Sequence, residues 1–208
     1  MKTMSVLGVM GVVAVAGVGM LGFAQRPEGA PVVASAPSEY AIDSVHSGVI
    51  FKIQHAGVSN FYGRFNKLAG SVSWDAANPE ATAINATIDA SSVDSNNKDR
   101  DKHLSGTDFF NAKQFPDITF KSTKLTKKSE NTFELAGEIT MVGKTKPVTG
   151  TLVVTGEKDA GKQFGYRVGM EATFTIKRTD FGMSYGVDKN VLGDDVAITV
   201  GFAGVKKN

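Results

Sequence analysis

The sequence of 208 residues contains no cysteine, which excludes a disulfide framework, a thiolate metal site, a cysteine nucleophile and a lipid-modified N-terminal cysteine. Proline is scarce, at 6 residues, and the 23 basic residues nearly balance the 21 acidic ones. A nearly neutral chain gives no reason to expect a nucleic-acid partner, because such binding depends on an excess of positive charge. Glycine is abundant, at 23 residues, among many Thr, Val, Ile and Phe residues. This composition is typical of a β-rich domain with tight turns.

The first 39 residues divide into an apolar run and a linker. Residues 4–24 follow Lys2 and carry no charge, so we expect residues 1–24 to be a secretory signal peptide, with a small-x-small cleavage site at its end. About 20 apolar residues also suffice to span a bilayer, so an uncleaved membrane anchor stays open as an alternative. Residues 25–39, rich in Pro, Ala and Ser, are expected to form a flexible linker. Either outcome predicts a periplasmic or secreted domain over residues 40–208, with or without a membrane tether through residues 4–24.

Eight runs of alternating apolar and polar residues occupy most of the remaining sequence, and such alternation is the pattern of half-buried strands. Most spacers are short, so consecutive strands should pair as antiparallel hairpins, and eight strands with one apolar face can close into a barrel. One long break, residues 92–116, follows the third run. The sequence therefore predicts an all-β fold, an eight-stranded antiparallel barrel with a short helical insertion between strands 3 and 4. The runs cover residues 49–55, 68–74, 84–88, 118–120, 133–141, 148–154, 164–176 and 196–202.

The predicted inner face mixes large and small apolar residues. Most of the 13 Phe residues fall on this face or in the long break, while Gly70, Ala86, Gly137 and Ala172 are interspersed among them. A barrel of eight strands can be filled by its own side chains or can hold one small ligand. The large residues favour a filled core and the small ones favour an open lumen, so both readings stay open.

The long break contains the polar segment KDRDKHLSGTDFF, residues 98–110. A histidine metal site would require His46, His55 and His103 to converge on one ion, but an extended strand separates the first two. A serine-based catalytic site lacks the Gly-x-Ser-x-Gly nucleophile elbow. Neither chemistry is favoured by this pattern.

We interpret this segment instead as a lid over one end of the barrel. Asn97 or Ser95 can cap a short helix, and Asp99 and His103 lie four residues apart, where their side chains can pair. The apolar residues that follow are expected to point into the barrel end and to close or gate the lumen. These residues are Leu104, Phe109, Phe110 and Phe115.

Five segments in order carry a family resemblance: YAIDSVHSGVIFKIQH, YGRFNKLAGSV, DKHLSGTDFFNAKQFPDITFKST, GEITMVGKTKPVTGTLVV, and RTDFGM with GDDVAITV. Together they span residues 40–205, and the domain resembles the YceI-like family of lipocalin-like bacterial proteins that bind polyisoprenoid lipids. The resemblance implies a barrel with a helical insertion, an apolar tunnel and a bound isoprenoid such as a polyprenyl chain or ubiquinone. It implies a binding protein and no enzymatic activity.

The sequence thus predicts an exported protein that sequesters or transports an isoprenoid lipid, with no cofactor and no metal. One alternative is an interaction module with a filled core. Another is a lipid-head hydrolase, for which His46, His103, Asp99 and Asp180 form the only plausible set. The residues predicted to contact the ligand are Phe51, Ile53, Trp74, Ile88, Phe109, Phe110, Phe120, Phe133, Leu135, Ile139, Tyr166, Met170, Phe174 and Phe202, with Asp99 and His103 as polar lid residues.

Overall fold

The computed structural model describes residues 36–207, which form eleven strands and one α-helix. The strands follow from the alternation of apolar and polar residues. Helix α1, Lys98–Leu104, lies between β6 and β7. The predicted signal peptide or anchor and most of the predicted linker fall outside the described residues. The strands are β1 Ser38–Ile42, β2 Gly48–His55, β3 Ser59–Phe65, β4 Leu68–Trp74, β5 Ala83–Asp89, β6 Val93–Asp94, β7 Asp117–Lys127, β8 Thr132–Met141, β9 Lys144–Asp159, β10 Tyr166–Lys177 and β11 Leu192–Lys206.

Eight of these strands form a closed antiparallel ring. The order is β1-β4-β5-β7-β8-β9-β10-β11, and β11 closes the ring by pairing with β1. Strand β11 is long enough to serve two neighbours on one side: residues 204–206 pair with β1 and residues 192–201 pair with β2. The predicted eight-stranded barrel with a helical insertion between its third and fourth strands is confirmed.

The sheet also extends beyond the ring, which the sequence pattern did not predict. The run predicted as the first barrel strand, residues 49–55, is β2 in this extension, and β1 takes its place in the ring. Strands β2, β3 and β6 continue from the first part of β11. At Asn66-Lys67 the chain turns a corner and exchanges its partner strand. Phe65 pairs with Val49 of β2, whereas Leu68 pairs with Ile88 of β5. Both Phe65 and Leu68 are buried, so the two residues between them redirect the strand while keeping its apolar face inward.

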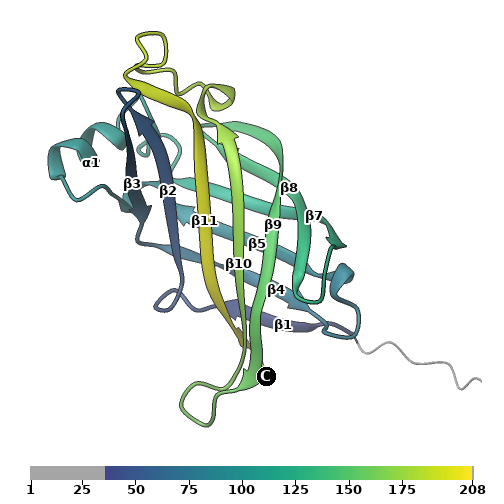
Figure 1. The fold of residues 1–208 in the computed structure, drawn as a ribbon. Coiled ribbons are helices and arrows are strands. Elements are labelled where there is room, and N and C mark those ends of the chain that lie inside the picture. Colours follow the sequence, from purple (N-terminus) through teal and green to yellow (C-terminus); the bar gives the residue numbers. More distant parts are fainter. Residues whose placement is uncertain (1–35, 208) are drawn as a thin grey trace, which may run out of the picture. The chain divides into compact units, whose positions relative to one another are not determined.

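The two ends of the barrel differ in what covers them (Figure 1). Helix α1 and residues 178–191, which connect β10 to β11, lie at one end, here called the α1 end. The turn between β9 and β10, residues 160–165, lies at the other end, here called the hairpin end, close to the C-terminal end of β11. Within residues 36–207, no helix has the length and apolar character needed to cross a membrane.

Candidate functional site

The barrel encloses a cavity of about 400 Å³. Its wall is formed by inward-facing apolar side chains of β2, β5, β7, β8, β10 and β11, together with residues of α1 and of the segment after it. Several wall residues, such as Phe51, Phe120 and Ile198, are only partly buried although they face inward, because they border empty space rather than other side chains. The alternative of a completely filled core is therefore wrong.

The cavity opens at the α1 end. Wall residues there are accessible to solvent, with Tyr185 49% exposed and Val191 41% exposed. The polar wall residues His55, Arg100 and His103 also lie on elements at this end. By contrast, Phe202, the cavity-lining residue of β11 nearest the hairpin end, is only 6% exposed. The lumen is thus a blind tube with one mouth.

Tightly packed side chains fill the barrel between the cavity and the hairpin end. On β10, Ala172 lines the cavity and Met170, two residues further along the same inward face, does not. On β8 the same boundary falls between Leu135 and Phe133. We call this filled region the plug, and its members are each 5% exposed or less. The plug consists of Tyr40, Val72, Trp74, Leu125, Phe133, Leu152, Val168 and Met170.

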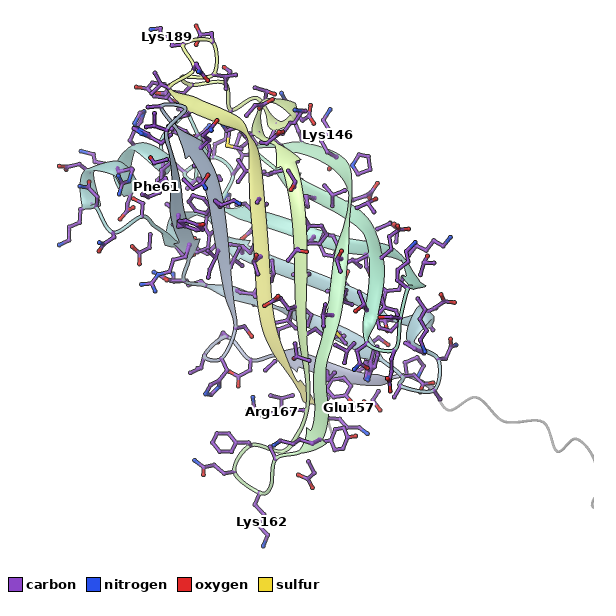
Figure 2. All side chains as sticks on the ribbon, in the orientation of Figure 1. Phe61, Lys146, Glu157, Lys162, Arg167 and Lys189 are labelled. Carbon is purple, nitrogen blue, oxygen red and sulfur yellow. The ribbon has the colours of Figure 1, made fainter. Side chains whose placement is uncertain are left out.

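A carboxylate ties the plug together at the hairpin end. Trp74 Nε1 donates a hydrogen bond to Glu157 Oε2 at 2.9 Å, and the Tyr40 hydroxyl donates one to Oε1 at 3.2 Å. The Trp74 ring also meets the Phe133 ring edge to face, with centroids 6.4 Å apart. Burial, assisted by the nearby Glu157 charge, raises the pKa of Tyr40 to about 12. Figure 2 shows Glu157 at the hairpin end, opposite Phe61 beside α1.

Glycines on neighbouring strands provide room for the aromatic rings of the wall. A Cβ atom on Gly137 would lie 2.5 Å from Cε2 and Cζ of Phe120, and one on Gly150 would lie 2.6 Å from Cδ1 of Phe174. The Phe51 ring occupies the corresponding space over Gly63. A glycine in a strand often marks such a close approach. The rings can therefore lie against the wall instead of crossing the lumen.

Helix α1 is held at the mouth by local polar contacts. The Asn97 side chain accepts a hydrogen bond from Arg100 N at 3.0 Å, which confirms Asn97 as the N-cap. Ser95, the other candidate, instead binds Asp101 and Arg100. The Arg100 guanidinium also lies 4.3 Å from the centroid of the Phe61 ring. The lid is thereby joined to β3, in the extension of the sheet beyond the ring.

The apolar residues after the helix behave as predicted for a lid, with one exception. Leu104, Phe109 and Phe110 all line the cavity. Phe115 does not line it, and its ring packs over Gly143 in the turn between β8 and β9.

The predicted pairing of His103 with Asp99 is wrong. His103 Nε2 lies 2.9 Å from Asp108 Oδ2 instead. The imidazole meets the rings of Phe109 and Tyr185 edge to face, with centroid distances of 5.1 and 4.9 Å. These contacts turn the ring toward the loop, away from the preceding helical turn where Asp99 lies. His103 therefore connects α1 to residues 178–191 across the mouth.

Sequence reasoning missed Arg178, which organises the other side of the mouth. The residue is 3% exposed and donates hydrogen bonds to four backbone carbonyl oxygens, at distances of 2.8 to 3.2 Å. Burial lowers the pKa of its guanidinium. The sequence contained a signal, because Arg178 continues the inward parity of Phe174 and Ile176 and so had to be buried. The carbonyl oxygens belong to Met183, Tyr185, Leu192 and Gly193.

The structure brings most of the predicted ligand-contacting residues to one cavity. Ten line its wall: Phe51, Ile53, Ile88, Phe109, Phe110, Phe120, Leu135, Ile139, Phe174 and Phe202. Trp74, Phe133 and Met170 lie in the plug, below the point where the cavity ends. Tyr166 begins β10 at the hairpin end and is 39% exposed. We therefore remove these four from the proposed contact set.

The residues of the hydrolase alternative do not come together. His46 binds Asp43 at 2.8 Å and meets the Phe164 ring of the β9–β10 turn, which places it at the hairpin end. His103 lies at the α1 end. In residues 36–207 no group of three or more His, Cys, Asp or Glu residues is placed to hold a metal ion.

Comparisons with known proteins agree with this architecture. Residues 40–203 match the model of the YceI-like domain. A UPF0312 protein of Ectopseudomonas mendocina is 38% identical over 173 residues, covering 82% of this chain and 88% of that protein. A UPF0312 protein of Shewanella putrefaciens is 38% identical over 180 residues, covering 86% and 92%.

Solved structures show the same barrel. BcnA of Burkholderia cenocepacia superimposes with a TM-score of 0.70 at 25% identity, covering 78% of this chain and 98% of that one. A polyisoprenoid-binding domain from Saccharophagus degradans gives a TM-score of 0.64 at 14% identity, covering 82% and 99%. At that low identity the second likeness concerns the fold alone.

Proposed function

The chain belongs to the YceI-like domain family, and from this premise we propose that it binds one isoprenoid lipid in its lumen and sequesters or carries that lipid outside the cytoplasm. The observation that carries the proposal is the blind, predominantly apolar cavity with His55, Arg100 and His103 at its mouth. A tail would occupy the tube, and its polar head would remain near His55, Arg100 and His103.

The chemistry of the wall favours a hydrocarbon tail. The side chains that line the lumen beside the plug, Leu135, Ala172 and Phe202, are apolar, so a polar group there would have no side-chain hydrogen-bond partner. A hydrocarbon tail needs no such partner and gains about 0.8 kcal/mol for each methylene removed from water. The net gain for a ligand of this size is roughly 0.3 kcal/mol per atom. Burial of apolar area and a matching shape therefore suffice for binding, and no chemical reaction is needed.

Two further observations support parts of the proposal. The solved domain of Saccharophagus degradans with the same fold is named as polyisoprenoid-binding, which makes a polyprenyl chain or a quinone with such a tail the preferred ligand class. Export rests on the uncharged run of residues 4–24 after Lys2, which would act as a cleaved signal or as a tether.

The test is to express the full chain, extract the purified protein with organic solvent and analyse the extract by mass spectrometry. A co-purified prenyl chain, or uptake of an added prenyl alcohol, is the expected result. An empty protein that takes up no added chain contradicts the proposal. The mass of the exported form also reports whether residues 1–24 have been removed.

A pair of variants locates the ligand. Ala172 lines the cavity, and Thr173 beside it on β10 faces outward and is exposed. Ala172→Trp should block uptake because the indole would occupy the lumen, whereas Thr173→Trp should leave uptake unchanged. Circular dichroism of both variants shows whether the barrel still forms.

A further inference from the structure

We infer that the plug is a chain-length stop and that Met170 and Phe133 are the residues that set the longest isoprenoid tail accepted. This inference rests on the proposed function and adds to it a selectivity for tail length. It is carried by the sharp boundary between lumen and plug within strands that continue past it on the same inward face.

On β10 and β11 the boundary is set by side chains. Both strands continue past it to the hairpin end, and their inward positions alternate across it in unbroken register. On the other side of β10, strand β9 has one extra residue, Thr155, opposite Gly169 and Met170. Ala172 of β10 pairs with Val200 of β11, and both line the cavity. In the next inward pair, Phe202 still lines the cavity, but Met170 belongs to the plug. On β10 and β11, therefore, larger side chains end the tube at this level.

The plug is held too firmly for a tail to displace it. Met170 and Phe133 are 2% and 1% exposed, and neither lines the cavity. The Trp74 ring packs against Phe133 and is fixed in turn by its hydrogen bond to Glu157. Interiors packed at this density resist insertion of even one additional methylene group.

A blind tube with a rigid floor makes a quantitative prediction about affinity. Each isoprene unit that enters the lumen should strengthen binding roughly tenfold, since a five-carbon unit contributes five atoms of apolar contact. Units beyond the floor stay in water at the mouth and should change affinity by less than about twofold. Affinity should therefore rise with tail length and then reach a plateau.

The experiment measures the affinity of the full chain for geraniol, farnesol, geranylgeraniol and longer prenyl alcohols, by competition with a fluorescent prenyl probe. Met170→Ala should move the plateau to a longer tail by deepening the tube. Ile53→Ala is the matched control, because Ile53 lines the same cavity near the mouth and its removal widens the tube without deepening it. Met170→Val and Phe133→Leu replace Met170→Ala if circular dichroism shows that it does not fold.

The outcomes separate this inference from the proposed function. If the unmodified protein binds no prenyl alcohol of any length, the proposed function fails. If it binds them but affinity keeps rising to the longest tail, or if folded plug variants reach the plateau at the unmodified length, only the chain-length stop fails. A plateau that shifts equally in Ile53→Ala also overturns it.

Discussion

The aromatic ring of Phe51 fills the space over the Cα atom of Gly63, the residue directly opposite it in the β2–β3 pair. The two residues depend on each other, because the Phe51 ring occupies the space that a side chain at position 63 would fill. The Phe120 ring likewise fills the space over Gly137, although the direct partner of Phe120 in the β7–β8 pair is Ile139. Glycine is needed at these positions for space, since Gly63 and Gly137 do not have the positive φ that would call for it on backbone grounds.

The first prediction concerns this wall. Gly63→Ala places a methyl group inside the Phe51 ring, so the ring must move into the lumen or the strands must separate. We expect a loss of about 1 to 3 kcal/mol in the free energy of unfolding, as for other overpacked sites, together with weaker prenyl binding. Urea denaturation and the competition assay measure the two effects. Gly201→Ala is the control, because a Cβ there meets nothing within 4 Å; equal effects of the two changes would contradict this account of the wall.

The second prediction concerns the lid. The His103–Asp108 pair is partly exposed, with side-chain exposures of 43% and 52%, so it should contribute less than about 1 kcal/mol to unfolding. The same pair joins α1 to the segment after it, beside the mouth. Asp108→Asn should therefore speed release of a bound prenyl probe several-fold with little change in stability, measured by stopped-flow fluorescence.

The helix itself supplies a control for the lid prediction. Asp99 is the partner that helical spacing favoured, yet His103 turns away from it toward Asp108. Asp99→Asn should leave the release rate unchanged. If Asp99→Asn accelerates release as much as Asp108→Asn does, the His103–Asp108 pair does not hold the lid in place.

Sequence patterns predicted the barrel well because strand alternation is a local property. Inward parity placed Phe51, Phe120 and Phe174 on the lumen wall, and the break between the third and fourth strands marked the helix. The end of the lumen was not predictable in this way. Met170 and Ala172 have the same parity and both face inward, and only the volume contributed by all neighbouring strands decides which of them borders empty space.

The partner of His103 was missed for a related reason. The rule for residues four apart on a helix describes an isolated helix, whereas the imidazole here gains contacts with Phe109 and Tyr185 that lie outside it. Arg178 shows the opposite case. Its inward parity alone predicts a buried charge. A buried guanidinium has five N–H donors that need acceptors, and backbone carbonyl oxygens can supply them. The four carbonyl oxygens that bind Arg178 are here called the carbonyl cage.

The third prediction concerns that cage. Arg178→Met leaves four backbone carbonyl oxygens without their donors in a buried site. Each orphaned buried acceptor is costly, so we expect the free energy of unfolding to fall by on the order of 3 kcal/mol or more. Urea denaturation measures the loss.

The neighbouring base serves as the control for the cage. Lys177 is exposed and pairs with Asp195 at 2.9 Å, so Lys177→Met should change the free energy of unfolding little. A small effect of Arg178→Met, comparable with that of Lys177→Met, would show that the loop does not depend on the cage.

The last prediction is a dependence of stability on alkaline pH. Burial beside Glu157 raises the pKa of Tyr40 from 10.0 to about 12, because the protein stabilises the neutral phenol. A pKa raised on folding contributes stability that is complete below pH 10 and is lost as pH rises from 10 toward 12. Tyr40→Phe lacks this contribution at every pH, and it also lacks the hydrogen bond to Glu157, worth about 1 kcal/mol.

The difference in unfolding free energy between the unmodified protein and Tyr40→Phe isolates this effect, because all other groups titrate in both. It should fall by on the order of 2 to 3 kcal/mol between pH 10 and pH 12. Urea denaturation at a series of pH values in this range provides the measurement. Tyr62→Phe is the control, since Tyr62 is 59% exposed on β3, and its difference curve should be flat. A difference curve for Tyr40→Phe that is equally flat would mean that Tyr40 ionises without disturbing the plug, and the plug would then not be the rigid floor on which the chain-length stop depends.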